Sequence, residues 1–496
     1  MNYIIRPFIA AGVLSLAAGC SSFLDDPQPQ QSLPTTEAFQ TASDTETGLI
    51  GAYNAAQDSD LFGTNTTQCA ELLGDNAIWR GSFPSYSDIF QVQMVANNPE
   101  IEDMWQQAYQ VNNQANLVIQ ATETLEDPDF DSEVEAGKTL RDQFKGEALF
   151  LRGATMFEIV RFYGLPYSTS SSTDPGVPIV TEPVVDFGSV TFPARNTVEE
   201  VYNQAIADLT EASNLLPDRV GRGRANRFAA LAYLAEIAFM QGRYGDALGF
   251  TQTIIDEGGF ALTDDANGFF VNEGSVEEIW TIVHTVQDNP GVNGSLPTFH
   301  HVNGRGGDVA ISGALILGGF NQVLTPDQQQ AIDDAGLSAV DQRVTQLTSN
   351  DTFNIEKYED FGTNADDAPI WRYAEVLLMH AEALAREDGV TQEAVDLLNQ
   401  VRNRSVRVLD AEGNQVPNSS DFVSYGTGDF ASAEALIDAI LLEKRVEMAY
   451  EGTRFHDLMR TRQDVKGRSF ADPLLRFPIP QREIDANPNL EQNPGY

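Results

Sequence analysis

Residues 443–460 read EKRVEMAYEGTRFHDLMR. Acidic and basic side chains alternate along this stretch, and side chains three or four positions apart on a helix lie close enough to pair. Glu451 and Arg454 have this spacing. The pattern predicts one or two helices here, with ion pairs that tie the C-terminal segment to the helical repeats of the chain.

Apolar spacing predicts further helices upstream. Apolar residues between Leu140 and Phe162 recur at helical steps, and Gly164-Leu165-Pro166 ends the run because proline cannot continue a helix. Thr197 and Glu200 have the spacing of a capping box, which predicts the start of another helix that ends before Pro217.

Two stretches, at about 197–257 and 372–402, resemble helix–turn–helix repeats of the tetratricopeptide kind. In each, small and apolar residues flank a glycine that suits the turn between paired helices. These residues are Leu234, Ala235, Ala238, Gly242, Ala247, Leu248 and Ile254 in the first, and Ala381, Glu382, Ala385, Gly389, Ala394, Leu398 and Val401 in the second. The intervening residues, about 260–370, are rich in Gly, Asn, Asp and Thr. The predicted fold is therefore mainly α, with tetratricopeptide-like repeats, long irregular insertions and a few short strands.

The first twenty residues have the layout of a lipoprotein signal. One charge, Arg6, precedes an apolar run at 9–18, and small residues at 17–19 stand directly before Cys20. We expect a signal peptide at 1–19, a lipidated Cys20 with a tether at 20–36, and a single domain at 37–496. The alternative is an ordinary cleaved signal with an incidental cysteine. No later segment reaches the roughly 20 apolar residues of a membrane-spanning helix.

Charge excludes one class of partner. The chain has 30 basic and 73 acidic residues and a net charge of −43. A phosphate backbone would be repelled by this charge, so nucleic acid is not an expected partner.

Signatures of catalysis are missing from the sequence. It contains no His-Glu-x-x-His, no Gly-x-x-x-x-Gly-Lys-Ser/Thr and no Gly-x-Ser-x-Gly. The five histidines lack the spacing of a zinc site. Residues 410–414 resemble only half of a calcium loop. We therefore expect a binding protein without a metal, a cofactor or an enzymatic activity.

Several motifs, in order along the chain, closely resemble the SusD/RagB family. They are Phe23-Leu24-Asp25, Arg161–Pro166, Arg372–Ala383, Glu443–Arg460, Phe477–Pro480 and Asn487–Tyr496. The resemblance implies a mostly helical lipoprotein on the cell surface, anchored in the outer membrane, that captures a nutrient, commonly a glycan or oligosaccharide. It also implies a partner, a SusC-like TonB-dependent transporter over which the protein sits as a lid.

Ligand residues are expected in loops, where a rigid scaffold can present them. Sugar rings have apolar faces and hydroxyl edges, so a glycan site needs aromatic side chains beside polar ones. Segments 75–86 and 299–305 have this composition. The candidate ligand-binding residues are Asp75, Asn76, Trp79, Arg80, Tyr86, Phe299, His300, His301 and Arg305. The structural alternative is that each aromatic residue is partly buried beneath a loop.

Three functions compete with glycan capture. A peptide-binding member of the same family would share every motif quoted above. A surface glycoside hydrolase would need two carboxylates at a set distance in space, which sequence alone does not give. A protein-binding scaffold could be built on the helical repeats.

Overall fold

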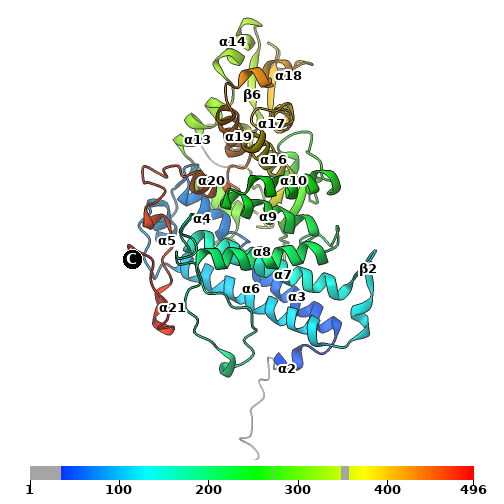
Figure 1. The fold of residues 1–496 in the computed structure, drawn as a ribbon. Coiled ribbons are helices and arrows are strands. Elements are labelled where there is room, and N and C mark those ends of the chain that lie inside the picture. Colours follow the sequence, from blue (N-terminus) through cyan, green and yellow to red (C-terminus); the bar gives the residue numbers. More distant parts are fainter. Residues whose placement is uncertain (1–34, 272, 348–356) are drawn as a thin grey trace, which may run out of the picture.

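The computed structural model describes residues 35–271, 273–347 and 357–496. Helices dominate this part of the chain and the strands are short, which confirms the predicted mainly α fold (Figure 1). The longer helices are α3 (Ala42–Gln57), α4 (Asn65–Leu73), α5 (Pro84–Gln91), α6 (Pro99–Thr124), α7 (Leu140–Tyr163), α8 (Val198–Leu215), α9 (Arg227–Gln241), α10 (Tyr244–Glu257), α14 (Pro326–Asp334), α16 (Tyr373–Asp388), α17 (Gln392–Ser405), α19 (Ala433–Glu447) and α20 (Thr453–Arg460). Shorter ones are α2 (Thr35–Ala38), α11 (Gly268–Val271), α12 (Leu296–His300), α13 (Gly313–Gly318), α15 (Gln342–Leu347), α18 (Ser420–Val423) and α21 (Gln481–Ala486), with 3-10 turns at Pro128–Asp131, Phe187–Ser189, Phe320–Gln322, Thr427–Asp429 and Pro473–Leu475.

Local sequence signals set the ends of the central helices. Thr139 and Asp142 form a capping box that starts α7, and Gly164 caps its C-terminus. Thr197 and Glu200 form the predicted capping box of α8. Helices α6, α7 and α8 pack on one another in order and lie side by side in Figure 1. The predicted end of a helix at Gly164 and the predicted start of another at Thr197 are therefore confirmed.

The two repeat-like helix pairs stack directly on each other. Helices α9 and α10 form the first pair, α16 and α17 form the second, and α10 packs on α16. The Thr251 hydroxyl of α10 lies 2.8 Å from His380 Nδ1 of α16, within hydrogen-bond distance. Between the pairs, strands β4 (Glu278–Ile282) and β5 (Val309–Ile311) contribute to the core, whereas helices α13 and α14 extend toward the top of Figure 1. Repeats far apart in sequence thus bury a shared face.

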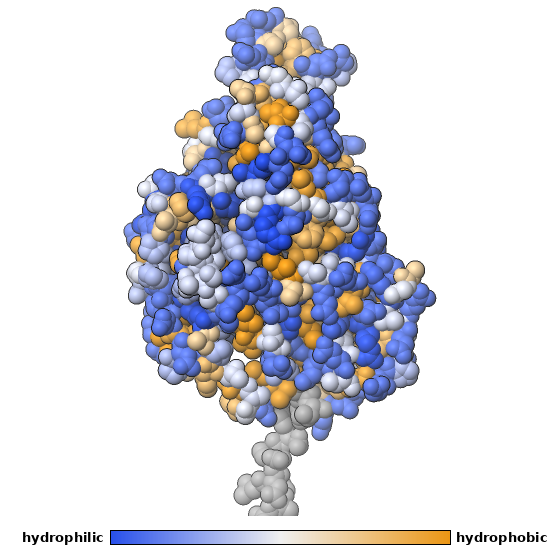
Figure 2. Space-filling model, in the orientation of Figure 1, coloured by the Kyte–Doolittle hydropathy of each residue, from blue (hydrophilic) through white to orange (hydrophobic). Residues whose placement is uncertain are grey.

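Within the described residues, the strands form four two-stranded antiparallel sheets. The pairs are β1 (Ala77–Trp79) with β5 (Val309–Ile311), β2 (Glu133–Glu135) with β3 (Lys138–Thr139), β4 (Glu278–Ile282) with β7 (Ala368–Arg372), and β6 (Ser338–Asp341) with β8 (Val406–Leu409). Three of these sheets pair strands that are far apart in the sequence, whereas β2 and β3 are neighbours. Figure 2 shows that the face in view is mostly hydrophilic, with small separate apolar areas, as expected for a chain with a net charge of −43.

The C-terminal motif forms two helices, and its ion pairs differ from the predicted local ones. Between α19 and α20, Gly452 has a φ of 82°, so the helix is broken where Glu451 and Arg454 would have shared a face. Glu451 instead pairs with Arg372, 2.7 Å away, and Arg454 pairs with Asp75, 2.8 Å away. The predicted pair between Glu451 and Arg454 is wrong.

The predicted tie between the C-terminal motif and the repeats is confirmed. Arg460 of α20 lies 2.7 Å from Glu382 of α16, and Lys444 of α19 lies 3.1 Å from Glu375 of the same helix. All four side chains are at most 6 % exposed, so these pairs are shielded from the salt that weakens surface pairs.

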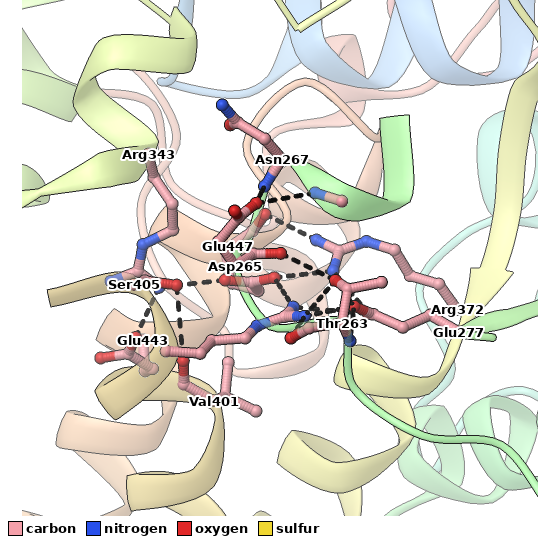
Figure 3. A network of polar contacts seen from close by, with 12 residues as sticks. Thr263, Asp265, Asn267, Glu277, Arg343, Arg372, Val401, Ser405, Glu443 and Glu447 are labelled. Atoms are coloured by element: carbon pink, nitrogen blue, oxygen red, sulfur yellow. Dashed lines mark hydrogen bonds and ion pairs between the residues drawn. The ribbon is translucent and has the colours of Figure 1, made fainter. Parts of the chain in front are cut away.

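Glu447, the last residue of α19, lies at the centre of a buried charge network (Figure 3). Its carboxylate lies 2.7 Å from Arg372, 2.6 Å from Arg404 and 3.2 Å from Arg343. The connected network has five cations, Arg343, Lys357, Arg372, Arg402 and Arg404, and five anions, Glu277, Asp341, Glu443, Glu447 and Glu451. Burial acts to raise the pKa of Glu447, but the three arginines outweigh it and hold that pKa well below its usual range. The charges of the network balance, so it can be buried as a unit.

Glu71 of α4 gives the fold a pH dependence. Its buried carboxylate accepts a hydrogen bond from the Gly452 N–H at 2.9 Å, and burial raises its pKa to about 7. Burial likewise raises the pKa of Asp60 to about 7. A carboxyl group with a raised folded-state pKa contributes stability that is fully present below its unfolded pKa, here 4.5 for Glu71, and is lost as pH rises through the folded value.

We therefore expect the melting temperature to rise as the pH is lowered from 8 to 5. Glu71→Gln should reduce this rise because the amide does not titrate, whereas Glu126→Gln, at an exposed position, should keep the wild-type slope. Thermal melts followed by circular dichroism measure both. Equal pH slopes in the wild type and Glu71→Gln would show that Glu71 ionises normally in the folded chain.

Candidate functional site

The two segments predicted to bind a ligand lie side by side although they are far apart in sequence. Strand β1 ends at Trp79, which stands opposite Val309 of β5. One residue further on, the Arg80 N–H donates to the Asp308 carbonyl at 2.7 Å. This short ladder places segment 75–86 against segment 299–311.

Four aromatic side chains of these segments form one cluster. Tyr86 lies 5.2 Å from Trp79 and 5.4 Å from Phe299, measured between ring centroids. Phe83 lies 6.3 Å from Phe299. All three contacts are tilted or edge-to-face, which the charge distribution of aromatic rings favours. Tyr86 and Phe299 are buried, whereas Trp79 and Phe83 are half-buried and form the outer edge of the cluster.

One arginine, Arg305, contacts an outer ring, and a second, Arg80, is near Trp79 in the sequence. The Arg305 guanidinium lies 4.3 Å from the centre of the Phe83 ring, and Asp308 holds its Nε at 2.7 Å. Arg80 follows Trp79 directly in the sequence, and its side chain is exposed. We call Trp79, Arg80, Phe83 and Arg305 the aromatic platform. Apolar ring surface edged by guanidinium donors can hold a flat ligand that has an apolar face and polar edges.

Asp75 and Asn76, also predicted as ligand residues, contact arginines of the C-terminal helices. Asp75 Oδ1 accepts from Arg454 Nε at 2.8 Å, and Asp75 Oδ2 lies 3.2 Å from Arg445. Asn76 is fully buried, and its Oδ1 accepts from Arg445 Nε at 2.8 Å. Both residues therefore fasten β1 to the C-terminal helices.

Tyr86, Phe299 and His300, also predicted as ligand residues, are each buried in the structure. The Tyr86 hydroxyl donates to Asn65 at 2.6 Å. His300 Nε2 lies 3.0 Å from Gln68 Oε1, and burial lowers the pKa of His300 to about 3, so the ring is neutral. Tyr86 and Phe299 pack against the outer rings Trp79 and Phe83, whereas the His300 ring packs against Tyr358 and Tyr450.

His301 lies at the margin of the cluster. Its ring stacks on Phe361 at 4.4 Å between centroids, and 9 % of the residue is exposed. It orders the loop that carries Arg305 and offers little surface of its own.

Comparisons with known proteins agree with the motifs and the fold. A family model described as "Starch-binding associating with outer membrane" matches residues 22–239. A second, described as "SusD family", matches residues 341–472. The chain belongs to the SusD/RagB family.

Relatives match this SusD/RagB chain along nearly its whole length. SusD-like protein P2 of Formosa agariphila is 26 % identical over 98 % of both chains, and SusD-like protein P38 of the same organism is 24 % identical over 98 % of this chain and 97 % of its own.

Solved structures share the fold. A SusD superfamily protein from Bacteroides thetaiotaomicron has a TM-score of 0.76 at 22 % identity, covering 92 % of this chain and 100 % of its own. A putative sugar binding protein from Bacteroides vulgatus has a TM-score of 0.73 at 25 % identity, with coverages of 92 % and 99 %. A SusD-like carbohydrate binding protein from the same species has a TM-score of 0.69 at 18 % identity, with coverages of 91 % and 98 %.

Phe83 is the platform residue of this SusD/RagB chain that sequence reasoning missed. It lies within the predicted segment, directly before Pro84 at the start of α5, but nothing in the sequence distinguishes it from Tyr86. Within the described ranges, no three His, Cys, Asp or Glu side chains are arranged to hold a metal ion. None of the helices described here is long and apolar enough to span a bilayer.

Proposed function

We propose that this chain captures an oligosaccharide on the aromatic platform and delivers it to a TonB-dependent transporter of the SusC type in the outer membrane. The observation that carries the proposal is the convergence of Trp79 and Phe83, from one segment, with Arg305, from another. Both rings are half-buried, so the fold holds them in place and leaves part of each accessible.

The chemistry of the platform suits a sugar. A pyranose ring can lay its C–H face on an aromatic ring, and burial of that apolar area contributes affinity. The guanidinium groups of Arg80 and Arg305 can donate to ring hydroxyls and fix the orientation of the sugar. Arg305 is already held by Asp308 and Asn293, at 2.7 and 2.6 Å, so little side-chain entropy is lost when it binds.

The comparisons support a saccharide ahead of the alternative peptide ligand. One protein of the same fold is described as a putative sugar binding protein and another as carbohydrate binding. The family model over the N-terminal half is described as starch-binding. These descriptions also favour binding over hydrolysis.

A ligand screen tests the proposal. The purified full chain is applied to a glycan array and to a peptide library, and each hit is then incubated with the protein and analysed for products. We expect saturable binding to one class of oligosaccharide, which is recovered intact. Binding to peptides alone would overturn the saccharide proposal, and shortened oligosaccharides would point to a hydrolase.

We also propose that Cys20, which lies outside the described residues, anchors the chain in the outer membrane through lipid. Cys20→Ala should abolish incorporation of labelled palmitate and release the protein from the membrane fraction. Cys69, buried in α4, provides the matched control, because Cys69→Ala should leave the labelling intact. Normal labelling of Cys20→Ala would contradict the anchor.

The transporter partner has a test of its own. We expect a tagged full chain to co-purify from detergent-solubilised outer membranes with a large TonB-dependent protein encoded nearby. Recovery of the chain alone under mild detergent conditions would count against delivery, without bearing on ligand binding.

A further inference from the structure

The largest of the described cavities lies away from the aromatic platform. It has a volume of about 890 Å³ and is lined by residues of α8, α9, α10 and α20, together with the segments around 165–174 and 470–476. Helices α8, α9 and α20 lie near one another in the middle of Figure 1. Its aromatic lining includes Tyr167, Tyr202 and Tyr244. Cavities of several hundred Å³ that combine aromatic and charged groups are typical of small-molecule sites.

Arg476, in the wall of this cavity, is a buried cation that forms no ion pair with a described carboxylate, although the charge of Asp472 acts on it from farther away. Only 3 % of the residue is exposed, and its guanidinium donates to the Leu475 and Phe470 carbonyls at 3.2 and 3.3 Å. No carboxylate of the described residues lies within ion-pair distance of it. Burial lowers the pKa of Arg476 to about 10, which leaves it charged at neutral pH.

Arg476 differs in this from other buried arginines of the chain. Arg343, Arg372 and Arg460 each pair with at least two carboxylates. The chain has 73 acidic residues, yet none of the described ones forms an ion pair with Arg476. An unpaired buried charge is costly, and an anion bound in the cavity would offset that cost.

Other groups in the cavity favour an anion near Arg476. Arg161 also lines it, and although Glu158 and Glu236 pair with its terminal nitrogens, its buried Nε has no acceptor. His456 lies in the same wall. Burial holds the pKa of His456 well below its usual range, and the positive charges of Arg161, Lys444 and Arg476 lower it further. The exposed Arg462, which has no ion-pair partner among the described residues, adds a further positive charge.

A second part of the lining is suited to hydroxyl groups. Asp174 and Glu199 line the cavity together with Ser168 and Ser170, and the Ser170 hydroxyl donates to Asp174 at 2.7 Å. Carboxylates accept hydrogen bonds from sugar hydroxyls but repel anions. The lining therefore combines a cationic part with a hydroxyl-accepting part.

We propose that this cavity is a second binding site, which takes an acidic saccharide whose carboxylate or sulfate ester pairs with Arg476. The sugar ring lies among the tyrosines, and its hydroxyls reach Asp174 and Glu199. The site is independent of the aromatic platform, so either one can bind ligand without the other.

Matched sugars test the site. Galactose, galacturonate and galactose 6-sulfate differ at carbon 6, and glucose, glucuronate and glucose 6-sulfate repeat the series. Calorimetric titration of the full chain at low salt should give at least about tenfold tighter binding for the anionic members of one series, because charge-assisted hydrogen bonds are roughly twice as strong as neutral ones. The tighter of the two anions identifies the preferred substituent.

Variants locate the binding. Arg476→Gln should remove the preference for the anionic sugar, and Arg462→Gln should weaken it severalfold. Arg407→Gln removes one cation outside the cavity that likewise has no ion-pair partner among the described residues, and it should change nothing. Trp79→Ala should also leave this binding unchanged, which separates the cavity from the platform.

Three results would overturn the proposal. They are equal affinity for neutral and anionic sugars, equal affinity in Arg476→Gln and Arg407→Gln, and a crystal of the wild-type chain soaked in galacturonate and galactose 6-sulfate without an anionic group on Arg476. The soaked crystal decides the matter if Arg476→Gln does not fold.

Discussion

Glu447→Gln should lower the free energy of unfolding by about 3–5 kcal/mol, the typical cost of removing one partner from a buried ion pair. The substitution keeps the shape of the side chain and removes the anion that contacts Arg343, Arg372 and Arg404. These three guanidinium groups would then stay buried with one negative charge too few. Urea denaturation followed by circular dichroism measures the loss.

Asp438→Asn provides the control on the same helix. Asp438 is exposed on α19, so its replacement should change the free energy of unfolding by no more than about 0.5 kcal/mol. A loss below about 1 kcal/mol in Glu447→Gln would mean that the network contributes little and that apolar packing alone holds the C-terminal helices.

Trp79→Ala should weaken oligosaccharide binding by roughly thirtyfold, which corresponds to the loss of about 2 kcal/mol at a binding hot spot. The ring lies at the outer edge of the cluster, 5.2 Å from Tyr86 and 6.2 Å from Phe299, so it can stack on a sugar while the buried rings support it. Calorimetric titration with the oligosaccharide found in the screen measures the change in dissociation constant.

Two comparisons separate lost binding from lost folding. Phe187→Ala removes an aromatic ring that is 100 % exposed elsewhere and should leave the affinity unchanged. Phe299→Ala removes a fully buried ring and should destabilise the fold by about 3–5 kcal/mol. Wild-type affinity in Trp79→Ala would remove Trp79 from the binding site. A melt that collapses as far as that of Phe299→Ala would show that Trp79 belongs to the core.

Local signals in the sequence predicted the helices well. The capping box at Thr197 and the Gly164 terminus act within a few residues of themselves, so their effect is visible without tertiary structure. Local sequence did not predict the ion-pair partners of charged residues. Glu451 lies close to Arg454 in sequence, yet the positive φ of Gly452 turns the chain, and Arg372 becomes its partner.

The candidate site was predictable in its segments and only partly in its residues. Aromatic and polar composition identified both loops, and the β1–β5 ladder joins them. Which rings face inward depends on that long-range pairing, so Tyr86 and Phe299 could not be distinguished from Phe83 by sequence. The cavity at Arg476 has no local signal at all, because its lining comes from segments spread over more than half of the chain.

The most direct measurement is a crystal structure of the full chain with a neutral oligosaccharide found in the screen. A pyranose ring should lie on Trp79 or Phe83, with hydroxyl groups within hydrogen-bond distance of Arg80 or Arg305. An oligosaccharide bound elsewhere, with the aromatic platform unoccupied at saturating concentration, would contradict the proposed capture site.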